Sequence, residues 1–118
     1  MQARGFGVDE ITQVGTQEIE TTLVTMVFLA NNATALSAVL SQYVVLTRGE
    51  AGCRNVDFCV SSTQANRFVI VQKWTSPDAA RSHFDSDPMI EMAKLCNGLL
   101  DTAPQIDLLD TISAHDVA

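Results

Sequence analysis

Two side chains suited to chemistry, those of Trp74 and His83, lie nine positions apart around a predicted corner between a strand and a helix. The segment Phe68–Trp74 is rich in β-branched and aromatic residues, which is typical of a strand. Ser76 is a favourable helix N-cap, and Pro77 suits the first helical position. We therefore expect Trp74 to end a strand and His83 to lie about two turns into the following helix.

His83 is the main candidate for a catalytic role. Because imidazole titrates near neutral pH, it can take a proton from a phenolic hydroxyl group and return it later. The alternative is a histidine on the helix surface that binds water or Asp87. Trp74 offers a flat wall for an aromatic ligand, and its alternative is packing in the core or in a dimer interface.

The sequence carries no pattern for a bound cofactor or metal ion. Gly5-x-Gly7 does not continue as a dinucleotide fingerprint, and the other glycines form no phosphate-binding loop. The two histidines lie far apart, and Cys53 and Cys59 do not have zinc-ligand spacing. No nucleophile elbow is present. We therefore expect neither cofactor nor metal, and any chemistry would have to come from the substrate.

The composition excludes several classes of partner. The chain has 118 residues, with 14 acidic and 7 basic side chains and a net charge of −7. The basic residues are scattered, so nucleic acid and anionic membranes are poor partners. No apolar run is long enough to span a bilayer, and no signal-peptide pattern begins the chain. An odd count of three cysteines is typical of reduced thiols, which predicts a cytoplasmic protein.

Hydrophobic periodicity predicts one α+β domain over residues 22–112. Residues 1–21 before it form an arm or an added edge strand, and residues 113–118 after it form a tail. The order β-α-β-β-α-β corresponds to the ferredoxin-like arrangement. The expected elements are a strand at 22–29, a helix capped by Asn31 or Asn32 and stopped at Gly49, strands at 53–60 and 68–74, helical segments from Ser76 and from Asp87-Pro88, and a strand at 104–112.

The predicted sheet has apolar residues on both of its faces. Leu23, Val27 and Leu29 alternate with Val24 and Phe28 along the first strand. A sheet with one face in water would instead alternate apolar and polar residues. Since two helical elements cover only one face, we expect a second copy of the chain to cover the other, which gives a homodimer.

The residues around the corner resemble the antibiotic biosynthesis monooxygenase domains, which are small dimeric α+β-barrel proteins. The likeness rests on Arg48-x-Glu50-x-Gly52-Cys53 after the first helix, then Gln72-x-Trp74, Ser76 and His83. Within this family the chain is most similar to the quinol monooxygenases. Where the haem-degrading branch has Asn, Trp and His, the corresponding positions are Thr25, His83 and Ala93, so this branch is the less similar one.

The resemblance implies cofactor-independent oxidation of a hydroquinone or polyphenol by dioxygen, with His83 as the base. Parity alone does not decide which strand face lines the cavity. Two alternatives are a non-catalytic dimer that binds a small apolar ligand and, less favoured, a haem-binding or haem-degrading protein. The expected ligand-contacting residues are Trp74, Gln72, Tyr43, Thr25, Phe28, Met26 and Met92.

Overall fold

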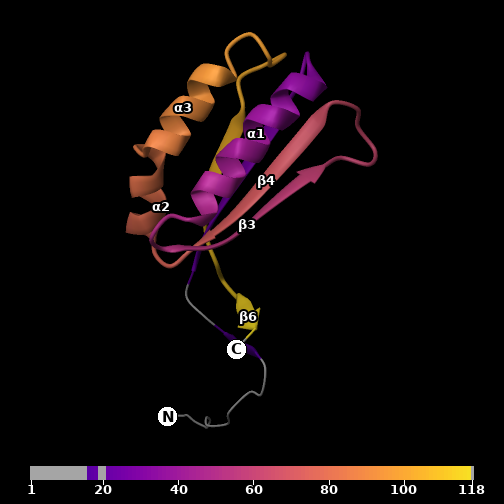
Figure 1. The fold of residues 1–118 in the computed structure, drawn as a ribbon. Helices are drawn as coiled ribbons and strands as arrows, with labels where there is room; N and C mark the ends of the chain where they lie inside the picture. The colour runs from indigo at the N-terminus through magenta and orange to yellow at the C-terminus, as the bar shows by residue number, and fades with distance from the viewer. Residues whose placement is uncertain (1–15, 19–20, 118) are drawn as a thin grey trace, which may run out of the picture.

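The computed structural model describes residues 16–18 and 21–117, and its elements form a ferredoxin-like α+β domain with one short strand added before it and one after it (Figure 1). The predicted fold class is therefore confirmed. In chain order the elements are β1 (Thr16–Glu18), β2 (Thr22–Leu29), α1 (Ala33–Arg48), β3 (Cys53–Val60), β4 (Arg67–Trp74), α2 (Pro77–Phe84), α3 (Asp87–Leu95), β5 (Gln105–Asp110) and β6 (His115–Val117).

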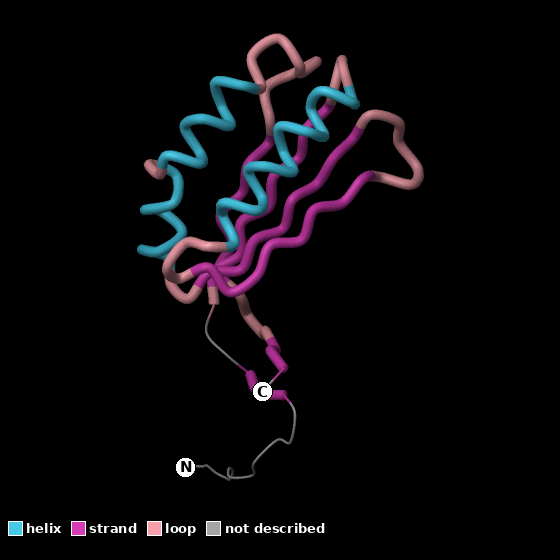
Figure 2. The backbone as a smooth tube through the Cα atoms, viewed as in Figure 1, coloured by secondary structure: helices cyan, strands magenta, loops and turns pink. Residues whose placement is uncertain are grey.

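The four longer strands form an antiparallel sheet in the order β3-β4-β2-β5. The two central strands, β2 and β4, are the ones that carry apolar residues on both faces. Figure 2 shows the three helices on one face of this sheet. No helix covers the other face within the described part of the chain, and that face carries the half-buried side chains of Leu23, Val27, Val69 and Val71.

The helices decide which face of each strand belongs to the core. On β2, Val24, Met26 and Phe28 are fully buried beneath the helices, while Thr25 and the residues that alternate with them lie on the open face. Apolar burial of this kind stabilises the fold by about 25 cal/mol per Å² of surface removed from water. The predicted alternation of side chains between the two faces is confirmed, and the packing of the helices decides which face is buried.

Side-chain caps fix where the helices begin. The Asn32 side chain accepts a hydrogen bond from the backbone N–H of Ala35, and the Ser76 side chain accepts one from Ala79. The second helical region divides into α2 and α3 because Ser86 caps a new helix immediately after α2 ends. The N-cap of α3 is thus Ser86, one residue before the predicted Asp87.

The predicted arm and tail meet in a separate two-stranded sheet. β1, from the arm, pairs antiparallel with β6, from the tail, so that Gln17 lies opposite Asp116. This strand is not an added edge of the main sheet. Apart from Thr21, the rest of the arm lies outside the described residues. Among the residues that are described, no helix has the length and apolar character needed to cross a membrane.

Candidate active site

Four polar or aromatic side chains predicted as site residues meet in the core between the helices and the sheet. His83 comes from α2, Tyr43 from α1, and Gln72 and Trp74 from β4. Each of the four is at most 2% exposed. The alternative of His83 as a surface histidine is therefore wrong: this imidazole is part of the core.

These side chains form one continuous hydrogen-bonded chain with Glu50. The indole Nε1 of Trp74 donates to Oε1 of Gln72 (2.8 Å), and Nε2 of Gln72 donates to the hydroxyl of Tyr43 (2.6 Å). The Tyr43 hydroxyl lies 2.6 Å from Nε2 of His83. Nδ1 of His83 lies 2.9 and 3.0 Å from the two carboxylate oxygens of Glu50.

The indole at one end of this chain and the neutral form of the His83 imidazole at the other set the direction of its hydrogen bonds. An indole N–H can only donate, and a carboxylate can only accept. Gln72 must therefore turn its amide oxygen to Trp74 and its NH₂ group to Tyr43. When the imidazole is neutral, the single hydroxyl proton of Tyr43 is donated to Nε2 of His83, which at 2.6 Å is a nearer and stronger acceptor than the Met26 sulfur at 3.6 Å. His83 then carries its ring proton on Nδ1 and donates it to Glu50.

Aromatic packing holds the imidazole in this orientation. The His83 ring lies 4.8 Å from the Trp74 ring, 5.6 Å from Tyr43 and 6.3 Å from Phe84, measured between ring centroids. The hydroxyl of Ser86, the N-cap of α3, lies 3.3 Å from Nδ1. With neighbours on its faces and both nitrogens bonded, His83 cannot rotate without breaking several contacts.

The structure adds Glu50 to the site. Glu50 is part of the sequence motif, but it is not among the predicted site residues. Its position two residues after Arg48 is typical of a turn with an ion pair between the two side chains. Instead, the Arg48 guanidinium donates to the backbone oxygen of Val56 (2.9 and 3.3 Å), and Glu50 binds His83. Glu50 and His83 are brought together only by the folded structure, since they lie 33 positions apart in the sequence.

Gly52 allows the Glu50 turn to lie against α2. Its φ is +85°, a conformation that glycine adopts easily, and an added Cβ would lie 2.8 Å from the Cβ of Ala79. The backbone N–H of Thr75 donates to the carbonyl of Gly52 (2.9 Å). These close contacts hold the turn after α1 beside the start of α2, which brings the Glu50 carboxylate within reach of His83.

Burial perturbs the acid–base properties of Tyr43. Removal of the phenol from water raises the pKa of Tyr43 to about 12, and the hydrogen bond from Gln72 offsets only part of this effect. Neutral Tyr43 is thus favoured in the folded chain, as a hydroxyl that donates to an imidazole requires.

We expect the raised pKa of Tyr43 to make folding weaker in strong base. Because the folded pKa exceeds the unfolded value, this contribution to stability is fully present below pH 10 and is lost as the pH rises towards 12. The loss is on the order of 2–3 kcal/mol. Tyr43 is the only tyrosine, so the ultraviolet absorbance of tyrosinate measures it alone. A midpoint near pH 10 in the folded protein would contradict this assignment.

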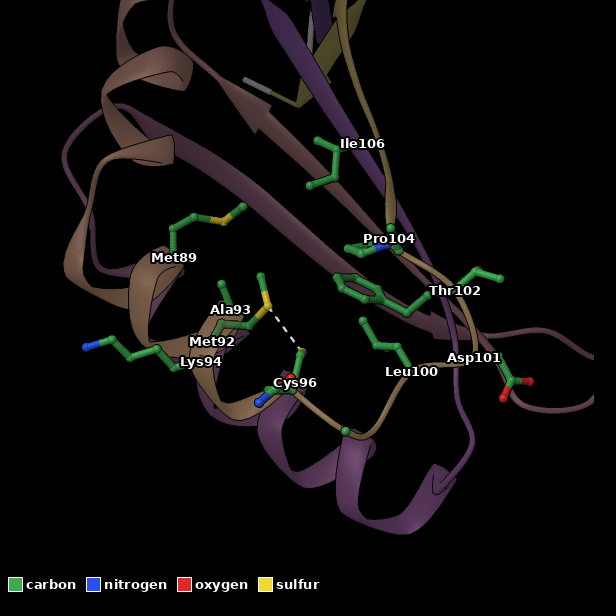
Figure 3. A pocket seen from close by; sticks show the side chains of 14 residues that line it. Met89, Met92, Ala93, Lys94, Cys96, Leu100, Asp101, Thr102, Pro104 and Ile106 are labelled. Carbon is green, nitrogen blue, oxygen red and sulfur yellow. Dashed lines mark hydrogen bonds between the residues drawn. The ribbon is translucent and has the colours of Figure 1, made fainter.

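A cleft of about 880 Å³ lies beside the hydrogen-bonded chain of side chains, between α3, the 96–104 segment and β5. Figure 3 shows Met89, Met92 and Cys96 on the α3 side of the cleft, with Pro104 and Ile106 on the other. The Cys96 thiol lies 3.5 Å from the Met92 sulfur, and burial raises the pKa of Cys96, which favours the neutral thiol. Two predicted ligand contacts, Phe28 and Met92, line this cleft.

Met26 connects the cleft wall with the polar chain. It pairs across the sheet with Ile106, which lines the cleft, and its sulfur lies 3.6 Å from the Tyr43 hydroxyl and 3.4 Å from Nε2 of Gln72. The polar chain itself is sealed from the cleft. Thr25 lies on the open face of β2, so the structure places it apart from the other candidates. Among the described residues, no three His, Cys, Asp or Glu side chains gather as metal ligands.

The sequence model for antibiotic biosynthesis monooxygenases matches residues 23–95, which is more than half of the chain. This chain belongs to the antibiotic biosynthesis monooxygenase family. The matched segment runs from β2 to the end of α3 and includes every member of the hydrogen-bonded chain. The resemblance inferred from the Glu50, Trp74 and His83 motif is thus confirmed. No curated protein sequence is significantly similar to this chain.

Solved structures share the fold of this antibiotic biosynthesis monooxygenase family member. Rv0793 from Mycobacterium tuberculosis is 24% identical, with a TM-score of 0.72 over 78% of this chain and 95% of that one. PA3566 from Pseudomonas aeruginosa is 24% identical, with a TM-score of 0.69 over 80% and 95%. A Caulobacter crescentus protein whose name places it in the same family is 17% identical, with a TM-score of 0.71 over 80% and 92%.

Proposed function

We propose that the protein is a cofactor-independent monooxygenase that oxidises a hydroquinone or related polyphenol with dioxygen. The observation that carries this proposal is the hydrogen bond from the Tyr43 hydroxyl to Nε2 of His83, because it provides a proton acceptor in a water-excluded site. The cleft of about 880 Å³ is large enough for a substituted aromatic ring.

The substrate supplies the reducing electrons in this proposal. Triplet dioxygen reacts slowly with closed-shell molecules, but a deprotonated hydroquinone donates an electron readily. The ring then forms a carbon–peroxide bond, and its O–O bond breaks. One oxygen atom stays on the ring and the other leaves as water, so that a hydroquinone and dioxygen give a hydroxyquinone and water.

His83 acts through Tyr43 in this scheme, since both imidazole nitrogens are already bonded. The substrate hydroxyl gives its proton to the Tyr43 oxygen as the Tyr43 proton passes to Nε2 of His83. Access requires movement of Met26, whose sulfur contacts the Tyr43 hydroxyl. Methionine is suited to such movement because its side chain is unbranched and flexible. Phe28 and Met92 form the walls, and Gln72 and Trp74 hold Tyr43 in place.

The decisive experiment is oxygen uptake by metal-free protein with a panel of hydroquinones. We expect protein-dependent uptake and a hydroxyquinone that carries one ¹⁸O atom from ¹⁸O₂. Tyr43→Phe is the matched variant, because it removes only the hydroxyl, and it should abolish most of the uptake. If the wild-type protein consumes no oxygen with any hydroquinone, the oxygenase proposal is wrong.

A non-catalytic ligand-binding module is the second candidate. It is favoured by the separation of the cleft from the polar chain: none of Trp74, Gln72, Tyr43 and His83 lines the cleft. Calorimetric titration with hydroquinones that are not turned over would support it, with Ala93→Trp as a cleft-filling control. A haem titration followed at the Soret band tests the less favoured tetrapyrrole alternative.

The proposed assembly is a homodimer through the open face of the sheet. Val71 lies near the centre of this face, between Thr25 on β2 and Asp57 on β3. We expect Val71→Asp to give a folded monomer at micromolar concentration, because a charge would be buried at the interface. Val45→Asp, at a position on α1 that is 65% exposed, should remain dimeric. A stable wild-type monomer in sedimentation velocity would contradict an obligate interface, for which about 2,000 Å² or more is typical.

A further inference from the structure

Glu50 differs from the other members of the hydrogen-bonded chain in its position. It lies in the turn between α1 and β3, and its side chain is 22% exposed, whereas the His83 side chain is 0% exposed. Its two oxygens lie at nearly equal distances, 2.9 and 3.0 Å, from Nδ1 of His83. The hydrogen-bonded chain of side chains therefore runs from Trp74, in the sealed core, to the Glu50 carboxylate, which reaches solvent.

The contacts of Glu50 explain why the reactive nitrogen faces Tyr43. Neutral imidazole has one protonated nitrogen and one with a free lone pair. A carboxylate on Nδ1 selects the tautomer whose proton is on Nδ1, which leaves the lone pair of Nε2 to accept from Tyr43. Without the carboxylate, the Ser86 hydroxyl is the group that remains near Nδ1. It can donate as well as accept, so it does not select the tautomer.

The charge of Glu50 matters at the next step. When Nε2 takes the Tyr43 proton, the ring becomes an imidazolium ion inside the core, where an unpaired charge is strongly destabilised. The Glu50 carboxylate pairs with that charge at hydrogen-bond distance. Arg48, the described basic residue nearest to Glu50 in the sequence, donates its hydrogen bond to the Val56 carbonyl instead.

We infer that Glu50 is the positioning residue of a Tyr43–His83–Glu50 relay: it sets the His83 tautomer and stabilises the imidazolium formed during proton transfer. The relay rests on the proposed function for its substrate. The proton leaves the substrate hydroxyl for the Tyr43 oxygen, and the Tyr43 proton moves to Nε2. The relay returns this one proton to the outer oxygen of the ring peroxide: Tyr43 donates its proton to that oxygen and regains one from Nε2. The resulting OH then leaves as water, together with the hydrogen of the ring carbon that carries the peroxide. Nδ1 keeps its proton throughout.

The first test measures the tautomer and needs no turnover. Two-bond ¹H–¹⁵N correlation spectra of histidine-labelled protein report which ring nitrogen is protonated, and the chain has only two histidines to assign. We expect the Nδ1–H form for His83 in the wild type and a shift towards Nε2–H in Glu50→Ala. An Nε2–H wild type, or an unchanged tautomer in Glu50→Ala, overturns the positioning role whether or not the protein oxidises quinols.

The second test measures the role of the charge. Glu50→Gln keeps the shape and an acceptor oxygen but removes the negative charge. We expect kcat for quinol oxidation to fall by about 10²-fold or more with KM nearly unchanged. Asp78→Asn is the matched control, since Asp78 is a carboxylate on the exposed side of α2. A Glu50→Gln variant as fast as the wild type overturns the relay.

Chemical rescue separates positioning from folding. Because Glu50 reaches solvent, formate can enter the space left in Glu50→Ala. We expect formate to raise the rate of Glu50→Ala at least about tenfold and to leave Glu50→Gln unchanged, because glutamine fills that space. Chloride at equal ionic strength is the control. Lack of rescue in a folded Glu50→Ala variant overturns the role of the carboxylate, whereas an inactive wild type overturns the proposed function alone.

Discussion

We expect replacement of His83 by glutamine to slow quinol oxidation by about 10²–10⁴-fold, the range that a general base contributes. Glutamine can still accept a hydrogen bond from Tyr43, but it cannot hold the proton that Tyr43 releases. His83→Ala should lose as much activity and also stability, because it leaves Tyr43 and Glu50 without their shared partner. Steady-state oxygen uptake with a saturating hydroquinone measures the effect.

Arg81→Ala is the matched control for the His83 variants. Arg81 lies on the same helix, its side chain is 64% exposed, and its ion pair with Asp78 is long at 3.8 Å. Such exposed pairs contribute little to stability. The control should therefore keep both activity and fold. If folded His83→Gln oxidises quinols at the wild-type rate, His83 has only a structural role in the core.

The second large effect is on stability. We expect Trp74→Ala to lower the free energy of unfolding by about 3–5 kcal/mol, as is typical for removal of a buried large aromatic side chain. Trp74 is 0% exposed, packs against the His83 ring at 4.8 Å and donates to Gln72. Urea denaturation followed by circular dichroism, at one protein concentration, measures the loss.

Trp74→Phe separates packing from hydrogen bonding at this position. It keeps an aromatic ring but removes the indole N–H, so the buried Gln72 oxygen loses its donor, which costs about 1–3 kcal/mol. Ile112→Ala, at a fully exposed position, should change stability by less than about 0.5 kcal/mol. A Trp74→Ala variant as stable as this control would show that the Trp74 site repacks without loss.

The arrangement as a whole places the polar chain in the core and the ligand cleft next to it. The Met26 sulfur contacts the Tyr43 hydroxyl, and Met26 pairs in the sheet with Ile106, which lines the cleft. Burial in the core shields the His83 imidazole from water.

The sequence by itself determined the elements of this protein. Helix starts follow from local chemistry: the side chains of Asn32 and Ser76 satisfy backbone N–H groups only a few residues away. Strands follow from alternation over a few residues, and the family follows from a short motif around Trp74 and His83. The cap at Ser86 lay one residue from the prediction because Asp87 and Ser86 are both good capping residues.

Only the tertiary structure decided how the site is assembled. β2 and β4 are apolar on both faces, so alternation alone cannot say which face the helices cover, and packing placed Met26 inward and Thr25 outward. The contacts Gln72–Tyr43 and Glu50–His83 join residues 29 and 33 positions apart. No local pattern encodes such contacts, because they depend on the close approach of the Gly52 turn to α2 and on the burial that excludes water from Gln72, Tyr43 and His83.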